Sequence, residues 1–156
     1  MSSPVAITHR PRLAAHRRVL PWLATAAARV LMHQPPARIR TVLEFLRRGA
    51  RPSTAEEASR SRSAVVAVSV SCAGEGCVQR SLATALLCRV HGHWPTWCSG
   101  VRVVPFLAHA WVEVDGEPVD EPYPRGYHTT LIRVPPQERS GKRPGRRPAA
   151  RSGARR

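Results

Sequence analysis

One feature constrains the fold and chemistry of this chain more than any other. It is a cysteine at the start of an apolar helix, followed by a histidine in an alternating strand and then by an acidic pair. Cys77 opens the helical pattern, His109 lies 32 residues later within residues 108–114, and Asp120 and Glu121 follow. A thiol is only slightly ionised at neutral pH, an imidazole can take its proton, and a carboxylate can orient the imidazole. The order cysteine, histidine, acid therefore predicts a nucleophilic site.

The surroundings of Cys77 favour a reactive cysteine over a buried structural one. A Gly-x-Gly stretch at 74–76 precedes it and allows close approach of the backbone. The start of a helix stabilises a thiolate and provides N–H groups, that of Cys77 among them, which can bind an oxyanion. Cys88 lies in the middle of the same helix and is interpreted as a core residue, whereas Cys72 and Cys98 have no comparable setting.

The acid that completes the site depends on the geometry of a hairpin. Asp115-Gly116 is the strongest two-residue hairpin signal in the chain. With a strict two-residue turn, Asp120 lies diagonally across from His109 on the same face, and Glu121 points away. A slip of one residue exchanges the two faces, so both acids remain alternatives, with the hairpin geometry favouring Asp120.

Periodicity predicts an α+β fold. Apolar spacing indicates helices at about 19–33, 37–48 and 77–90, and Thr54 with Glu57 forms a capping box for another helix that runs to about 68. Valines within 65–70 fit either the end of that helix or the start of a strand. Alternation predicts strands at about 96–103, broken by Ser99-Gly100, at 108–114, and at 117–121. We expect N-terminal helices and the Cys77 helix to pack on a small antiparallel sheet.

Charge divides the chain into three regions. The formal net charge is +15, yet residues 61–136 carry six Lys/Arg and six Asp/Glu. We predict a basic helical region at 1–53, a core that holds the site at 54–136, and a basic tail at 137–156. The tail is rich in Arg, Pro, Gly, Ala and Ser, and it is predicted to be disordered because it cannot bury a core.

The basic flanks leave an alternative function open. No zinc-finger spacing, helix-turn-helix pattern or aromatic-rich platform accompanies the charge, so nucleic-acid binding is not favoured. Basic flanks also suit an acidic protein or peptide, with an attraction that weakens as salt rises. The alternative is therefore a non-catalytic basic scaffold that binds an acidic peptide or nucleic acid.

The apolar run after Arg17-Arg18 has two interpretations. It resembles a short secretory signal, but Arg29 interrupts it and the apolar pattern then continues. A helical stripe that faces the core is the preferred interpretation, with these members: Trp22, Leu23, Ala26, Val30 and Met32. The run is too short to span a bilayer. We expect a cytoplasmic protein with reduced thiols and no membrane partner.

A zinc site is the main chemical rival to a cysteine nucleophile. Enough ligands are present: Cys72, Cys77, Cys88, His91, His93 and Cys98. Their spacing lacks the paired C-x2-C units that are typical of zinc sites, so we expect neither a metal nor a bound cofactor. The four histidines outside these sets are interpreted as surface residues: His9, His16, His33 and His128.

Two runs of this sequence resemble one known family, the lasso-peptide leader peptidases, which are transglutaminase-like cysteine proteases of bacteria. The first is C-V-Q-R-S-L-A-T-A-L-L at residues 77–87. The second is A-H-A-W-V-E-V-D-G at 108–116, preceded by G-V-R at 100–102 and P-F at 105–106. The resemblance covers roughly residues 54–134, and the basic tail is not part of it.

The resemblance implies a papain/transglutaminase-like fold with a Cys–His–Asp triad that includes Cys77 and His109. The family's acid lies about twelve residues after the histidine, which points to Glu121, whereas the hairpin geometry favours Asp120. The implied activity is removal of the leader peptide from a ribosomally made lasso-peptide precursor. The implied partners are the precursor, a separate small leader-binding recognition protein, and an asparagine-synthetase-like cyclase that uses ATP to close the macrolactam. The short length resembles the split form, in which the leader-recognition module is a separate protein.

Overall fold

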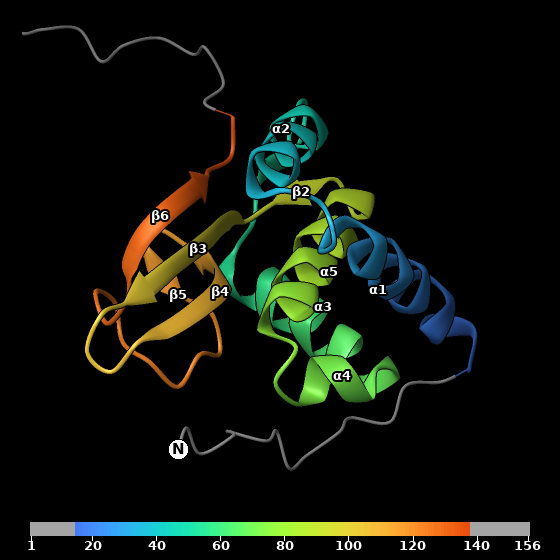
Figure 1. The fold of residues 1–156 in the computed structure, drawn as a ribbon. Helices are drawn as coiled ribbons and strands as arrows, with labels where there is room; N and C mark the ends of the chain where they lie inside the picture. The colour runs from blue at the N-terminus through green and yellow to red at the C-terminus, as the bar shows by residue number, and fades with distance from the viewer. Residues whose placement is uncertain (1–14, 138–156) are drawn as a thin grey trace, which may run out of the picture.

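Helices pack on one side of a small antiparallel sheet in the computed structural model, which describes residues 15–137 (Figure 1). Residues 1–14, and residues 138–156 of the predicted disordered tail, lie outside the described residues. The elements in chain order are η1 (Ala15–Arg18), α1 (Val19–Leu31), α2 (Pro36–Leu46), β1 (Arg51–Pro52), α3 (Ala55–Val68), α4 (Val70–Ala73), α5 (Cys77–Val90), β2 (His93–Trp94), β3 (Thr96–Arg102), β4 (Leu107–Val114), β5 (Glu117–Pro118) and β6 (Thr129–Val134). The α+β prediction is confirmed.

Local sequence signals set the starts of α2 and α3. Pro36 occupies the first helical position of α2, where a missing N–H costs nothing. The predicted capping box is present at α3, where the Thr54 side chain accepts from the Glu57 N–H and the Glu57 carboxylate accepts from the Thr54 N–H. The valines of 65–68 belong to this helix and not to a strand. Ser69 then takes an extended conformation and caps the short α4, which replaces part of the predicted 72–76 loop.

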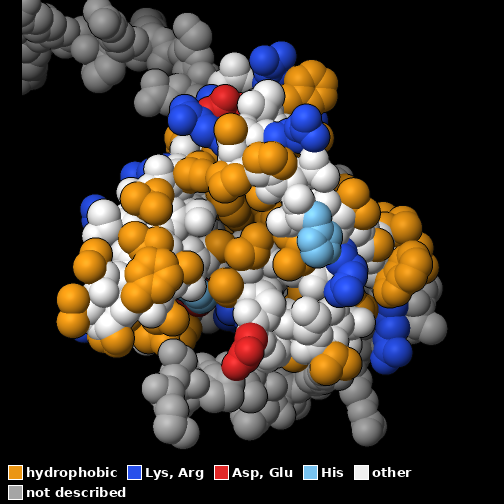
Figure 2. All heavy atoms as spheres, viewed as in Figure 1, with side chains coloured by type: hydrophobic (Ala, Val, Ile, Leu, Met, Phe, Trp, Pro, Cys, Tyr) orange, Lys and Arg blue, Asp and Glu red, His pale blue; other side chains and the backbone are white. Residues whose placement is uncertain are grey.

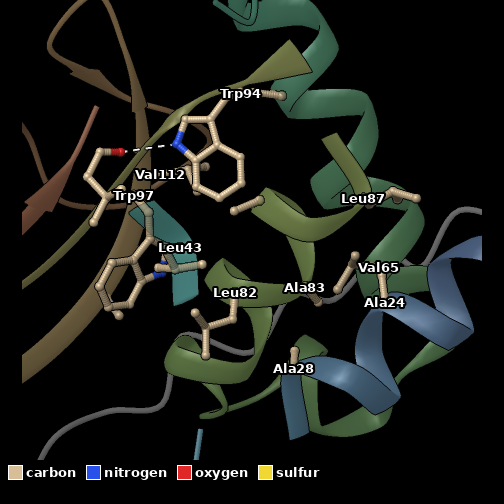
Figure 3. Packing of buried hydrophobic residues seen from close by; sticks show 14 of the residues in the cluster. Ala24, Ala28, Leu43, Val65, Leu82, Ala83, Leu87, Trp94, Trp97 and Val112 are labelled. Atoms are coloured by element: carbon tan, nitrogen blue, oxygen red, sulfur yellow. Dashed lines mark hydrogen bonds between the residues drawn. The ribbon is translucent and has the colours of Figure 1, made fainter. Parts of the chain in front are cut away.

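α5 is the centre of the core. It lies between α1 and α3 on one side and the sheet on the other (Figures 1 and 3). Leu82 and Leu87 are almost completely buried, together with side chains of α1, α2 and α3 that join the same core: Ala24, Ala28, Leu43 and Val65. Burying a Leu side chain contributes roughly 1.5–3 kcal/mol, so α5 is fixed firmly in place.

The larger sheet has the strand order β5-β4-β3-β6, and all its neighbours are antiparallel. Trp97 of β3 donates its indole N–H to the Ser81 hydroxyl on α5 at 3.1 Å, which ties the sheet to the helix layer. The predicted break at Ser99-Gly100 does not occur, and β3 continues through both residues. Its pairing with β6 shifts register there, and Gly100 lets the strands approach because a Cβ would collide with the Thr129 carbonyl. β6 and the two-residue parallel pair β1-β2 were not predicted.

The buried side of α1 is opposite to the predicted one. Its buried residues are Pro21, Ala24, Thr25 and Ala28. Trp22 is 60% exposed and Val30 is 70% exposed, so most of the predicted core stripe faces outward, and hydrophobic side chains lie at the surface over α1 (Figure 2). The small side chains allow α1 to approach α5 closely, which explains this choice of face. No helix within residues 15–137 combines the length and apolar character needed to cross a bilayer.

Candidate active site

Cys77 begins α5, as the sequence predicts, and Gly76 makes the turn before it. Gly76 has φ −72° and ψ 54°, the geometry of an inverse γ-turn, and the Cys77 N–H donates to the Glu75 carbonyl at 2.8 Å. The N–H that the sequence analysis expects to bind an oxyanion is therefore already engaged in this structure. Among the described residues, no backbone carbonyl accepts from the N–H groups of Val78 or Gln79, so these donors remain at the helix start.

The loop before Cys77 is held tightly from two sides. A Cβ added at Gly76 would lie 2.6 Å from the Ser71 carbonyl oxygen, so no larger residue fits there without movement of the backbone. Arg80 is buried and donates to the carbonyls of Cys72 at 3.1 Å and Gly74 at 3.0 Å. These contacts fix the position of the thiol at the start of the helix.

His109 of β4 lies against the Cys77 thiol. The ring and the thiol are close enough for each to shift the pKa of the other, and the Ala110 N–H also acts on the thiol. The ring nitrogen Nε2 lies 2.8 Å from Glu121 Oε2, which leaves Nδ1 for the thiol. Trp111 stacks nearly parallel to the histidine ring at 5.9 Å. The structure therefore brings the predicted cysteine and histidine together.

The acid beside His109 is Glu121. The hairpin follows the predicted two-residue turn as far as Val119. Asp120 then takes a positive φ of 51°, which ends the alternation of faces along the strand. This conformation turns Glu121 toward the histidine ring.

Asp120 makes a different contact. Its Oδ2 accepts a hydrogen bond from the Ser59 hydroxyl of α3 at 2.7 Å. The hairpin argument that favoured Asp120 as the partner of His109 is therefore wrong. It assumed strand geometry through residue 121, and a single left-handed residue is enough to reverse the outcome.

The electrostatics of the three groups favour an ion pair. Burial alone would raise the pKa of the Cys77 thiol, but its hydrogen bonds with His109 and the Ala110 N–H lower it below its ordinary value. Burial would lower the pKa of His109, yet its hydrogen bonds with Cys77 and Glu121 raise it to about 9. The pKa of Glu121 is lowered because His109 and two nearby arginines outweigh its burial. The site therefore favours a thiolate, an imidazolium and a carboxylate in a row.

A buried arginine contacts Glu121, the acid at the end of this row of three groups. Arg62 of α3 is 9% exposed, and its Nη2 lies 3.4 Å from Glu121 Oε1. Sequence reasoning did not find this residue. Nothing in the sequence around Arg62 distinguishes it from the exposed Arg60 two positions earlier, because only the fold brings α3 and the hairpin loop together.

His128 is buried and not a surface residue as predicted. It is 8% exposed, and its ring stacks on that of His109 at 5.1 Å. Burial, followed by the charge of His109, lowers the pKa of His128, which disfavours a second positive charge beside His109. A pocket of about 240 Å³ adjoins these rings and is also lined by Trp111, Glu121 and Tyr123.

The residues considered for zinc do not gather into one site. Within the described part of the chain, no three His, Cys, Asp or Glu side chains are grouped to hold a metal ion. The His93 ring instead hydrogen-bonds to the Ser53 hydroxyl at 2.7 Å, and all four cysteines are free thiols. Only Cys77 among the four is not fully buried.

One family model matches most of this chain. Residues 21–133 match the family model described as the transglutaminase-like superfamily. The matched range begins at the third residue of α1, ends at the penultimate residue of β6, and includes Cys77, His109 and Glu121. No curated protein and no solved structure matches the chain.

Proposed function

Because this chain belongs to the transglutaminase-like superfamily, we propose that it is a cysteine peptidase with Cys77 as its nucleophile. The observation that carries the proposal is the row of contacts from the Cys77 thiol to the His109 ring and on to the Glu121 carboxylate. A thiolate is the attacking form of cysteine, and the helix start and the imidazole both favour it here. His109 acts as acid and base, and Glu121, in place of Asp120, completes the triad.

The proposed reaction has two chemical steps. The Cys77 sulfur attacks the scissile carbonyl carbon, a C–S bond forms, and the π electrons move onto the oxygen. The C–N bond then breaks, His109 gives its proton to the leaving nitrogen, and the N-terminal fragment remains on Cys77 as a thioester. Water attacks this thioester while His109 takes a proton from it, and the sulfur leaves as a thiolate.

Stabilisation of the oxyanion falls to donors at the start of α5. The Cys77 N–H already donates to Glu75, so the remaining candidates are the N–H groups of Val78 and Gln79. Backbone N–H groups at a helix N-terminus carry partial positive charge and need no reorganisation during the reaction.

The substrate we propose is a lasso-peptide precursor, which is cleaved at the junction between its leader and its core. The two runs that resemble the leader peptidases carry Cys77 and His109, and they also supply the supports of the site. Arg80 holds the loop before the thiol, and Ser81 accepts a hydrogen bond from the sheet. Cleavage gives a core peptide with a free N-terminal amine, which is the group that macrolactam closure requires.

The same proposal defines the partners. A separate small recognition protein would present the leader, and an asparagine-synthetase-like cyclase would use ATP to activate the core for closure. In both steps every proton moves between His109 and either the leaving nitrogen or water, so the chemistry calls for no bound cofactor. A cytoplasmic setting fits, since the nucleophile must stay a reduced thiol.

Incubation with the precursor and the recognition protein tests this function. We expect mass spectrometry to detect one cut, at the leader–core junction. In water enriched in ¹⁸O, the heavy isotope should enter the new leader carboxylate, because water resolves the thioester. No cleavage in the complete mixture would contradict the proposal. A leader that ends in an amide, with no ¹⁸O, would indicate acyl transfer to an amine in place of hydrolysis.

Limited alkylation distinguishes the peptidase from the non-catalytic scaffold. Cys72, Cys88 and Cys98 are fully buried, and burial raises the pKa of each thiol, to about 11 for Cys88. A small dose of iodoacetamide near neutral pH should therefore label Cys77 first, as peptide mapping would show. Labelling of Cys77 should also begin at lower pH than for an ordinary thiol, because its lowered pKa keeps the thiolate present there. Unfolded protein is the control and should label at all four cysteines. Equal labelling of the four in the folded protein would favour the scaffold.

A further inference from the structure

Arg62 occupies a position that the reaction steps above do not use. Its buried guanidinium, carried by α3, contacts one oxygen of Glu121, while the other oxygen of Glu121 contacts His109. The Glu121 side chain is 4% exposed. A carboxylate this deeply buried would take up a proton if no cation were close to it.

α3 contacts the loop that carries the acid at two successive residues. Ser59 donates to Asp120, and Arg62, three residues later on the same side of the helix, pairs with Glu121. The loop follows the short β5, which pairs with β4 at only two positions. The sheet alone therefore holds the acid weakly, and α3 supplies the contacts that hold it against the ring.

Other charged groups face the same acid and histidine. Arg80 and Cys77 approach from α5, and His128 approaches from the segment before β6. The Arg80 guanidinium donates to the carbonyls of Cys72 and Gly74, and burial lowers the pKa of His128. Among the described residues, Arg62 is thus the one arginine or lysine in direct contact with the Glu121 carboxylate, whose other oxygen contacts the His109 imidazolium.

We propose that Arg62 is a positioning residue that holds Glu121 ionised and oriented against His109, and thereby maintains the thiolate of Cys77. Arg62 acts through Glu121 and touches neither the thiol nor the scissile bond. The inference rests on the proposed function for the role of Cys77. Its readout is alkylation of the thiol, which needs no precursor, so a failure here and a failure of leader cleavage are separate results.

The test is the pH dependence of Cys77 alkylation by iodoacetamide in Arg62→Met, Arg62→Gln and Arg62→Lys. Without the Arg62 guanidinium, Glu121 takes up a proton more readily and stabilises the His109 imidazolium less. The Cys77 thiolate then forms only at higher pH. We expect the Met and Gln variants to alkylate about tenfold more slowly below the wild-type midpoint, equivalent to a midpoint shift of about one pH unit. Arg62→Lys keeps the charge and should restore most of the rate.

Arg60→Gln is the matched control. Arg60 lies on the same helix, but its side chain is 69% exposed and its ion pair with Glu56 is long, at 3.9 Å. Its alkylation profile should equal that of the wild type. A purely structural role for Arg62 would lower the melting temperature without moving the midpoint of the folded protein. An unchanged midpoint in folded Arg62→Met or Arg62→Gln, or equal shifts for Lys and Met, would overturn the proposal.

A double variant keeps the proposal testable if a single Arg62 variant does not fold. Arg62→Met combined with Glu121→Gln removes both buried charges and leaves neither uncompensated. Because Arg62 acts through Glu121, the double variant should alkylate with the same pH profile as Glu121→Gln alone. A further shift on adding Arg62→Met would show that Arg62 acts by another route and would overturn the proposal.

Discussion

Replacing Cys77 by alanine is expected to abolish leader cleavage and to leave the fold intact. The alanine keeps the helix start, and Gly76 and Arg80 still hold the preceding loop. Loss of a nucleophile costs at least about a thousandfold in turnover, because the remaining groups only bind and orient the substrate. The comparison to make is the initial rate of precursor cleavage by wild type and variant, with circular dichroism and thermal unfolding to check the fold.

Cys72→Ala is a suitable control for this experiment. Cys72 is buried in α4, five residues before Cys77, and its sulfur has no place in the proposed chemistry. It should reduce stability slightly, by about 1 kcal/mol, and preserve cleavage per folded molecule. A well-folded Cys77→Ala protein that cleaves at the wild-type rate would exclude Cys77 as the nucleophile.

Glu121→Gln should reduce kcat/KM by on the order of a hundredfold or more, whereas Asp120→Asn should change it by less than about threefold. The two substitutions make the same chemical change at adjacent residues, but only Glu121 contacts His109. Loss of the carboxylate charge removes a cause of the raised pKa of His109, which then falls from about 9 toward its ordinary value. The imidazolium is lost above its pKa, so the alkaline limb of the pH–rate profile should move to lower pH.

Stability separates the same two variants. Glu121→Gln leaves the buried Arg62 without its counter-ion, which costs on the order of 3 kcal/mol, so rates should be measured well below its melting temperature. Asp120→Asn keeps an acceptor for Ser59 and tolerates the positive φ, so its melting temperature should hardly change. A large loss of activity in Asp120→Asn with normal Glu121→Gln would restore the hairpin prediction and contradict the triad proposed here.

Local patterns predicted the parts of the site that depend on local structure. The helix that starts at Cys77 and the strand that carries His109 follow from the spacing of apolar residues, and the Asp115-Gly116 turn follows from turn chemistry. The acid was uncertain because its position depends on the φ angle of one residue. Aspartate adopts positive φ more readily than most residues, yet no pattern marks which aspartate will do so.

Long-range contacts account for most of what the sequence did not predict. Arg62 and His128 are buried by segments far from them in the chain, and neither stands in a pattern that signals burial. The outward face of α1 was assigned to the core because large side chains usually lie inside. In this helix Ala24 and Ala28 pack inward instead, since close contact with α5 leaves space only for small residues.

The three groups of the row come from both layers of the molecule. Cys77 belongs to the helix layer and His109 to the sheet, while Glu121 extends from the sheet and is held by α3 of the helix layer. Any displacement of the sheet relative to the helices must therefore disturb the contact between thiol and imidazole and the contact between carboxylate and guanidinium together. The Cys77 thiolate is then favoured only when the sheet and the helix layer are packed against each other. The ionisation of the Cys77 sulfur therefore reports on how closely the sheet packs against the helix layer.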